Sequence, residues 1–219
     1  MSTLPGELVL LNPWRPRPPV DEPIKRKRLS QEIKVSSHSR EPGSGSARVQ
    51  WGEDAMVHVC VSPPSQPLQS TSSHDHAVLE MNLVLAPFAT RHSEFAVPEA
   101  EISRLTREAL ALVMDVNAYP KSVITFRVVI LSAEPTLRHI LPAVILGATA
   151  AVEAADLAVV GRVLATRSEQ GVTGFELKTN RLAILHCPAG VPELGPSLSA
   201  ALQLEEDLIA AGAIKPRFK

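Results

Sequence analysis

The stretch GSARVQWG (Gly45–Gly52), followed after two acidic residues by AMVHVCV (Ala55–Val61), decides the fold of this chain. In both halves apolar and polar residues alternate, which places every second side chain on the same face of an extended strand. Between them, Gly52–Asp54 has the residue types of a tight turn. We therefore predict an antiparallel hairpin of Ala47–Trp51 with Ala55–Ser62 as the start of a sheet.

Beyond the hairpin, strand patterns and helix patterns follow one another along the chain. Ser122–Leu131 is apolar on both faces, so we expect both faces to be covered. Pro142–Ala155 has almost no polar side, which places this helix inside the fold. The other predicted elements are strands at Val78–Leu85, Leu157–Ala165, Gly174–Leu177 and Arg181–Cys187 and helices at Glu99–Val116 and Gly195–Ala211. This order is typical of an α+β sandwich of sheet and helices.

The N-terminal part of the chain has a different composition. Ten of the nineteen prolines lie in the first 67 residues, and proline is excluded from helix interiors and central strands. We predict an extended proline-rich and basic arm over residues 1–43, with Ser36–Ser46 as a loop, and one domain over residues 44–219. Lys25–Arg28 (KRKR) is a solvated charge run, a nuclear import signal or an RNA contact, and the sequence leaves these three readings open.

Composition limits the classes of function. The 219 residues are 45% hydrophobic and 21% charged, enough for a globular core, and the net charge of −1 excludes a surface that binds polyanions all over. Residues 1–50 carry nine Lys and Arg against five Asp and Glu, so any contact with nucleic acid must be local. Cys60 and Cys187 lie in apolar runs and are predicted to be buried thiols, as in a reducing compartment. The longest apolar run without charge, His139–Val152, is too short to span a membrane, and we expect a soluble intracellular protein.

Motifs that carry chemistry by themselves are absent from the sequence. There is no Walker loop, no G-x-G-x-x-G and no G-x-S-x-G. The one histidine cluster, His74–His76, has no further ligand to complete a metal site and is predicted to be a solvated loop. We therefore expect no metal and no cofactor, and the residues alone identify no type of enzyme.

Four segments, in the same order and at similar spacing, resemble the RNase PH family. The hairpin with its exit Ser62-Pro63-Pro64 is similar to the family's opening hairpin. The other three are Ala86–Arg91, the helix Glu101–Val116 with the turn Tyr119–Ser122, and the alanine-rich helix Leu141–Ala154. The resemblance covers about residues 44–165. It implies an RNase PH-like (ribosomal S5 domain 2-like) fold, in which a mixed sheet packs against helices.

The resemblance also implies where catalytic residues belong. Active members hold the attacking phosphate in a glycine-rich loop that ends in Thr/Ser-Arg, at the start of a helix. Here that position reads SAEPTLRH (Ser132–His139): there is no glycine pair, Glu134 would repel phosphate, and Leu137 replaces the hydroxyl. Arg138 stands at the position of the arginine that binds the attacking phosphate in active members. Alternatively, Arg138 forms a salt bridge at the surface or at an interface.

A pair of aspartates on and just after the following strand is the family's second requirement, because they hold a divalent metal or activate the leaving group. Leu157–Thr166 contains no acidic residue, and the next candidates are Glu169 and Glu176. We therefore expect that catalysis is lost and assign no catalytic residue.

Within the family, the chain is most similar to the non-catalytic ring subunits of the eukaryotic RNA exosome, of the mRNA transport regulator type. This implies a structural subunit that supports RNA degradation and 3′-end processing, including that of rRNA, in the nucleus, nucleolus and cytoplasm. Its expected partners are other RNase PH-like subunits and RNA, which Arg91 and Arg138 would contact, and no membrane. The alternatives are an active phosphate-dependent 3′→5′ exoribonuclease and a small α+β binding module unrelated to RNA.

Overall fold

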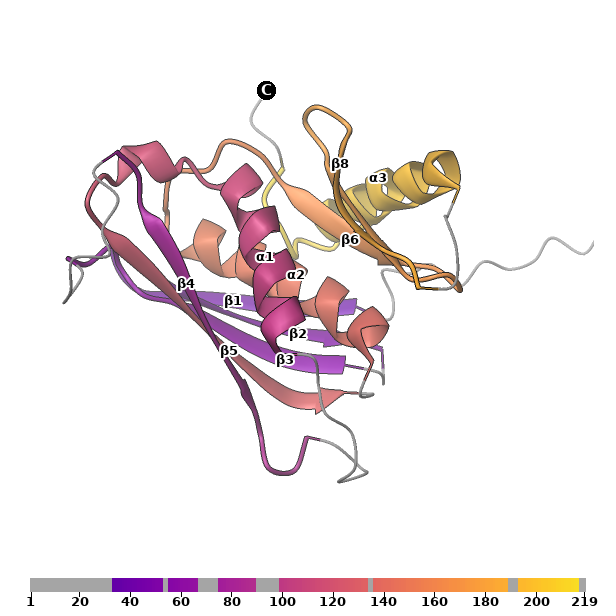
Figure 1. Cartoon of the computed structure of the whole chain (residues 1–219), viewed down its shortest axis with the longest axis horizontal. Helices are drawn as coiled ribbons and strands as arrows, with labels where there is room; N and C mark the ends of the chain where they lie inside the picture. The colour runs from indigo at the N-terminus through magenta and orange to yellow at the C-terminus, as the bar shows by residue number, and fades with distance from the viewer. Residues whose placement is uncertain are drawn as a thin grey trace, which may run out of the picture.

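Two sheets with helices between and beside them make up the part of the chain that the structure, a computed structural model, describes: residues 33–52, 55–66, 75–89, 99–133, 136–188 and 193–216 (Figure 1). The larger sheet has the strand order β1-β2-β3-β5-β4 and the smaller one the order β6-β7-β8. Strands of the larger sheet are β1 (Ile33–Glu41), β2 (Ser44–Trp51), β3 (Ala55–Val61), β4 (Val78–Leu85) and β5 (Val123–Ala133). The predicted α+β class with a mixed sheet is confirmed.

The hairpin expected from the sequence is β2 paired with β3. The two strands are antiparallel, with Val49 opposite Val57 and Ala47 opposite Val59, and all four side chains are fully buried. Gly52 adopts a φ of 58° in the turn, a left-handed conformation that favours glycine. The alternation read from the sequence therefore places one face of the hairpin in the core.

Strand β1 corrects the expected N-terminal boundary. We expected an extended arm up to residue 43 and a loop at Ser36–Ser46, whereas Ile33–Glu41 forms an edge strand antiparallel to β2. The reason is that Ile33 and Val35 alternate with polar residues and pack on the core, and Ile33 is only 5% exposed. The first 32 residues, which include Lys25–Arg28, lie outside the described residues.

Strand β5 lies in the interior of the larger sheet, between antiparallel β3 and parallel β4. Its inward residues, among them Phe126 and Val128, are fully buried under the helices. We expected both faces to be covered, whereas among the described residues the helices lie on one face of this sheet (Figure 1). The opposite positions include Thr125 and Arg127, and Arg127 is exposed. Polar residues at alternate positions are compatible with a solvent-facing side.

Helices α1 (Glu99–Val113) and α2 (Leu137–Ala154) lie over the covered face, and a short 3-10 turn, η2 (Val116–Ala118), follows α1. Helix α2 begins five residues before the predicted start at Pro142. Residues 137–141 already bury Leu137, Ile140 and Leu141, which explains why the helix extends past its proline. By length and composition α2 resembles a membrane-spanning helix, but 78% of it is buried inside the protein, as in a core helix.

The smaller sheet consists of β6 (Val163–Arg167), β7 (Val172–Glu176) and β8 (Arg181–His186) and carries α3 (Leu194–Ala210). We expected a strand from Leu157, but residues 157–162 run irregularly along the end of α1, where the Val160 amide donates to the Val113 carbonyl at 2.8 Å. Gly212, with a φ of 67°, follows α3 in a left-handed conformation that is common just after a helix end.

Both cysteines are half-buried thiols, which corrects the expected full burial. Cys60 occupies an outward position of β3 between the buried Val59 and Val61, and its Sγ lies 3.2 Å from His58 Nε2. For Cys187, burial raises the pKa of the thiol, although the thiol also donates a hydrogen bond to the Val172 carbonyl.

Candidate anion site at the start of helix α2

A pocket of about 300 Å³ opens where α2 begins and the turn between β6 and β7 approaches it. Thr136 precedes the helix, and the turn on the other side is closed by a hydrogen bond from the Ser168 amide to the Gly171 carbonyl at 2.8 Å. The lining residues are Thr136, Leu137, Arg138, His139, Glu169, Gln170, Gly171, His186 and Pro188. The site therefore combines side chains from three segments, one of which is the start of α2.

Arg138 is the residue of this pocket best suited to bind an anion. Its Nε is buried and has no hydrogen-bond partner among the described residues. A buried donor without an acceptor costs about 1–3 kcal/mol, so an anion that supplied the acceptor would be favoured. The partial positive charge at the start of α2 acts in the same direction.

Acidic and histidine side chains around Arg138 limit how strongly the pocket attracts anions. Glu169 lines the same pocket, and a carboxylate there opposes a phosphate group. His186 Nδ1 lies 3.1 Å from Glu101 of α1, and His139 Nδ1 lies 2.5 Å from the Thr136 hydroxyl. The Thr136 hydroxyl is thus already engaged. Glu169 is the one carboxylate that lines the pocket among the described residues.

Glu176, the second acidic candidate, lies at the end of β7 and does not line this pocket. Its carboxylate accepts hydrogen bonds from the backbone amides of Lys178 and Thr179 at 2.9 and 2.8 Å, and from the Thr179 hydroxyl. Burial acts to raise the pKa of Glu176, but these hydrogen bonds outweigh it and the pKa is lowered. The carboxylate therefore closes the turn between β7 and β8 in its ionised form.

Sequence reasoning identified part of this site. It selected Arg138 and considered Glu169 as the next acidic residue after the missing aspartates, and the fold brings both to one pocket. It did not anticipate His139, although the Thr-x-x-His spacing at a helix start is a usable signal, because residues three apart meet in the first turn. Arg91, Glu134 and Pro135 lie outside the described residues.

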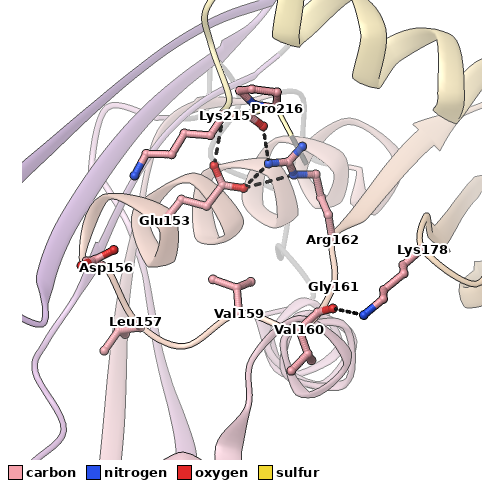
Figure 2. Close-up of a pocket in the computed structure, with 10 residues that line it drawn as sticks. All are labelled: Glu153, Asp156, Leu157, Val159, Val160, Gly161, Arg162, Lys178, Lys215 and Pro216. Atoms are coloured by element: carbon pink, nitrogen blue, oxygen red, sulfur yellow. Dashed lines mark hydrogen bonds and ion pairs between the residues drawn. The ribbon is translucent and has the colours of Figure 1, made fainter. Parts of the chain in front are cut away.

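A second pocket, of about 370 Å³, lies at the opposite end of α2 (Figure 2). Arg162 dominates its wall and is only 7% exposed. Its guanidinium donates to Glu153 Oε1 at 2.5 and 3.1 Å, to Glu205 Oε1 at 3.0 Å and to the Lys215 carbonyl at 2.7 Å. Because the guanidinium donates only to these internal acceptors, we assign Arg162 a structural role: it ties α2, the start of β6, α3 and the C-terminal segment together.

The mixed sheet, the buried alanine-rich helix and the anion pocket at its start together define an RNase PH-like domain. The family model described as "3′ exoribonuclease family, domain 1" (RNase PH) matches residues 28–158. The chain therefore belongs to the RNase PH family, as its four sequence segments predicted.

Proteins with similar sequences include the exosome complex component Rrp41 of Pyrobaculum aerophilum, which is 30% identical over 112 residues, and that of Pyrobaculum arsenaticum, which is 29% identical over 112 residues. Each alignment covers 49% of this chain and 46% of the relative, so the chain spans about half the length of the curated relatives it matches.

Among solved structures, rice (Oryza sativa) Rrp46 is similar with a TM-score of 0.64 at 14% identity, over 83% of this chain and 93% of that one. An Archaeoglobus fulgidus exosome with RNA bound to the active site is similar with a TM-score of 0.58 at 18% identity, over 82% of this chain and 90% of that one. At these identities the structural likeness establishes the fold.

Proposed function

We propose that this chain is a non-catalytic structural subunit of an exosome-type ring, where it pairs with other RNase PH-like subunits and contacts RNA that enters the ring. The observation that carries this proposal is the pocket at the start of α2. It retains an arginine, Arg138, whose buried Nε has no partner among the described residues, and Glu169 is the one carboxylate that the described residues bring to the pocket, where the family's chemistry uses a pair of aspartates. This set of residues therefore supports binding of a phosphate group, but not its activation for attack on RNA.

The likeness to exosome components supports the choice of partners. Relatives named as exosome components share about 30% identity with half of this chain, and a neighbour in fold is an archaeal exosome core. By analogy we propose other RNase PH-like subunits and RNA as partners in RNA processing and degradation. We propose the nucleus, nucleolus and cytoplasm as its location, with Lys25–Arg28 as the candidate import signal.

Phosphorolysis decides between this role and that of an active exoribonuclease. The purified chain is incubated with end-labelled single-stranded RNA, phosphate and Mg²⁺. We expect the RNA to stay intact with or without phosphate, because Glu169 is the one carboxylate that the described residues place beside Arg138. Release of nucleoside diphosphates that depends on phosphate and disappears in Arg138→Ala would contradict the proposal, since a contaminating nuclease would not respond to that substitution.

RNA binding by Arg138 is tested by the salt dependence of affinity. In the assembled complex, Arg138→Met is expected to weaken binding of single-stranded RNA and to lower the slope of log K against log salt by about 0.7, the value for one lost phosphate contact. Arg107→Met, an exposed arginine of α1, is the matched control and should leave the slope unchanged. The same measurement on Arg91→Met tests the other predicted contact. An Arg138→Met slope equal to that of wild type would remove Arg138 from the RNA path.

A further inference from the structure

Helices α1 and α2 pack on one face of the larger sheet, and its other face is open among the described residues (Figure 1). A line of basic side chains crosses that open face diagonally. Arg48 of β2 lies directly opposite His58 of β3, and Lys34 of β1 and Arg127 of β5 lie diagonally across from these two. All four alternate with buried residues of their strands, such as Val49, so they lie on the same face. We call these four residues the basic strip.

The fixed charges of the basic strip are not neutralised by the part of the chain that the structure describes. Lys34, Arg48 and Arg127 are exposed, and none of them forms an ion pair with a described carboxylate. Arg48 Nη2 donates to Met56 Sδ at 2.9 Å, a weak acceptor that leaves the other guanidinium donors available. In contrast to Arg162, these cations are therefore free to bind an anion from outside.

Two exposed carboxylates lie on the margins of the open face. Glu41 is at the end of β1, and Glu80 is on the edge strand β4, opposite Thr125 of β5. Neither lies on the diagonal of the basic strip, which runs from β1 to β5 for roughly 20 Å at the usual spacing of strands and residues in a sheet. The strip is a local feature, because residues 51–219 carry thirteen Lys and Arg against eighteen Asp and Glu.

A strip of this kind suits the phosphate backbone of a single-stranded nucleic acid. Phosphates repeat along such a strand, and arginine and lysine bind them regardless of base sequence. The outward positions of the five described strands hold no Phe, Tyr or Trp on which bases could stack, so the contacts should be to the backbone. An acidic peptide fits less well. Extended peptides attach to sheet edges through main-chain hydrogen bonds, whereas the strip crosses β2, β3 and β5, which are paired on both sides.

We propose that the basic strip binds the phosphate backbone of single-stranded RNA, independently of base sequence. This goes beyond the proposed function, which places RNA at Arg138 in the pocket at the start of α2. Helix α2 lies on the covered face of the larger sheet, so the pocket and the strip are separate surfaces. The chain therefore contacts RNA at two places, and each contact can be removed without the other.

The salt dependence of affinity is the first test. A fluorescent RNA of about 12 nucleotides is bound to the full chain and followed by anisotropy at several salt concentrations. Arg48→Met with Arg127→Met should weaken binding about tenfold and lower the slope of log K against log salt by about 1.4, the value for two phosphate contacts on a single strand. Arg107→Met with Arg181→Met, which removes two exposed arginines from α1 and β8, is the matched control and should leave the slope unchanged. Arg138→Met in the same assay reports on the pocket alone.

Charge and location provide two further readouts. Glu80→Gln removes a carboxylate diagonal to Arg127 and should tighten binding. Arg48→Glu with Arg127→Glu should weaken binding more than the two methionine substitutions do. Ultraviolet cross-linking of RNA that contains 4-thiouridine, followed by mass spectrometry, should give adducts on peptides of β2, β3 or β5.

Three results would overturn the proposal. They are a slope of Arg48→Met with Arg127→Met equal to that of the wild-type chain, cross-links confined to residues outside the larger sheet, and a labelled polyglutamate peptide that binds more tightly than RNA in a way that depends on the two arginines. The variants lie at exposed positions and should keep the unfolding temperature of the wild-type chain, so a loss of binding reports on the surface. The ring role is tested by the partners of the native complex, and either inference can fail without the other.

Discussion

Arg162→Met is expected to lower the free energy of unfolding by about 3–5 kcal/mol, because it leaves two buried carboxylates without their cation. Glu153 and Glu205 approach the guanidinium at 2.5 and 3.0 Å, and their side chains are 13% and 9% exposed. The Lys215 carbonyl would lose its donor at the same time. Urea unfolding of the variant and the wild-type chain at pH 7 measures the difference.

Removal of the two carboxylates separates this electrostatic cause from a simple loss of packing. The triple variant Arg162→Met, Glu153→Leu, Glu205→Leu should regain most of the loss. Arg104→Met removes an exposed i,i+4 pair whose side chains are each 53% exposed, and it should cost under about 0.5 kcal/mol. Equal effects of Arg162→Met and Arg104→Met would refute the assigned role of Arg162.

Gly45→Ala is expected to destabilise the domain by about 3 kcal/mol, the upper end of the range for overpacked cores. A Cβ at this position would lie 2.2 Å from the Ala151 carbonyl oxygen and 2.6 Å from the Ala155 nitrogen. Both are backbone atoms of the end of α2, so the clash is relieved only if β2 and α2 move apart. Since α2 is packed over most of the larger sheet, that movement disturbs the whole core.

Gly195→Ala provides the control for Gly45→Ala. Gly195 lies in the first turn of α3, and a Cβ there would meet no atom within 4 Å. Its substitution should leave stability unchanged or raise it by a few tenths of a kcal/mol, through the better helix propensity of alanine. A loss below about 1 kcal/mol for Gly45→Ala would show that β2 and α2 do not approach as closely as described.

Period-two and helical patterns predicted the hairpin β2–β3, the strand β4 and the helices α1 and α3 to within a few residues, because each has one apolar face. Strand β1 was missed because Ser36–Ser39 carries no apolar residue; only Ile33 and Val35 tie it to the core. Helix α2 was shortened because Pro142 marks a helix start more often than an interior position. The preference of proline for helix starts is a local signal, whereas the burial of residues 137–141 depends on the fold. Sequence patterns alone therefore could not show that the helix begins before Pro142.

The candidate site was predictable only in part for a similar reason. Arg138 was selected and Glu169 was considered as single positions, but that they share a pocket depends on how the turn between β6 and β7 folds back on α2. The cluster around Arg162 gave no local signal, because its members lie up to 62 positions apart in the chain and only packing brings them together. Glu176 was considered as a catalytic acid, whereas the hydrogen bonds of the adjacent turn hold its carboxylate away from the pocket.

The central claim is that the chain is a ring subunit. The protein composition of its native complex tests this claim most directly. The affinity-tagged full chain is purified from its own cells under mild conditions, and mass spectrometry quantifies the co-purified proteins. The account predicts other RNase PH-like subunits in near-equimolar amounts, in a particle that contains one copy of this chain per ring. Recovery of the chain by itself, or only as a self-dimer, with no RNase PH-like partner would contradict it.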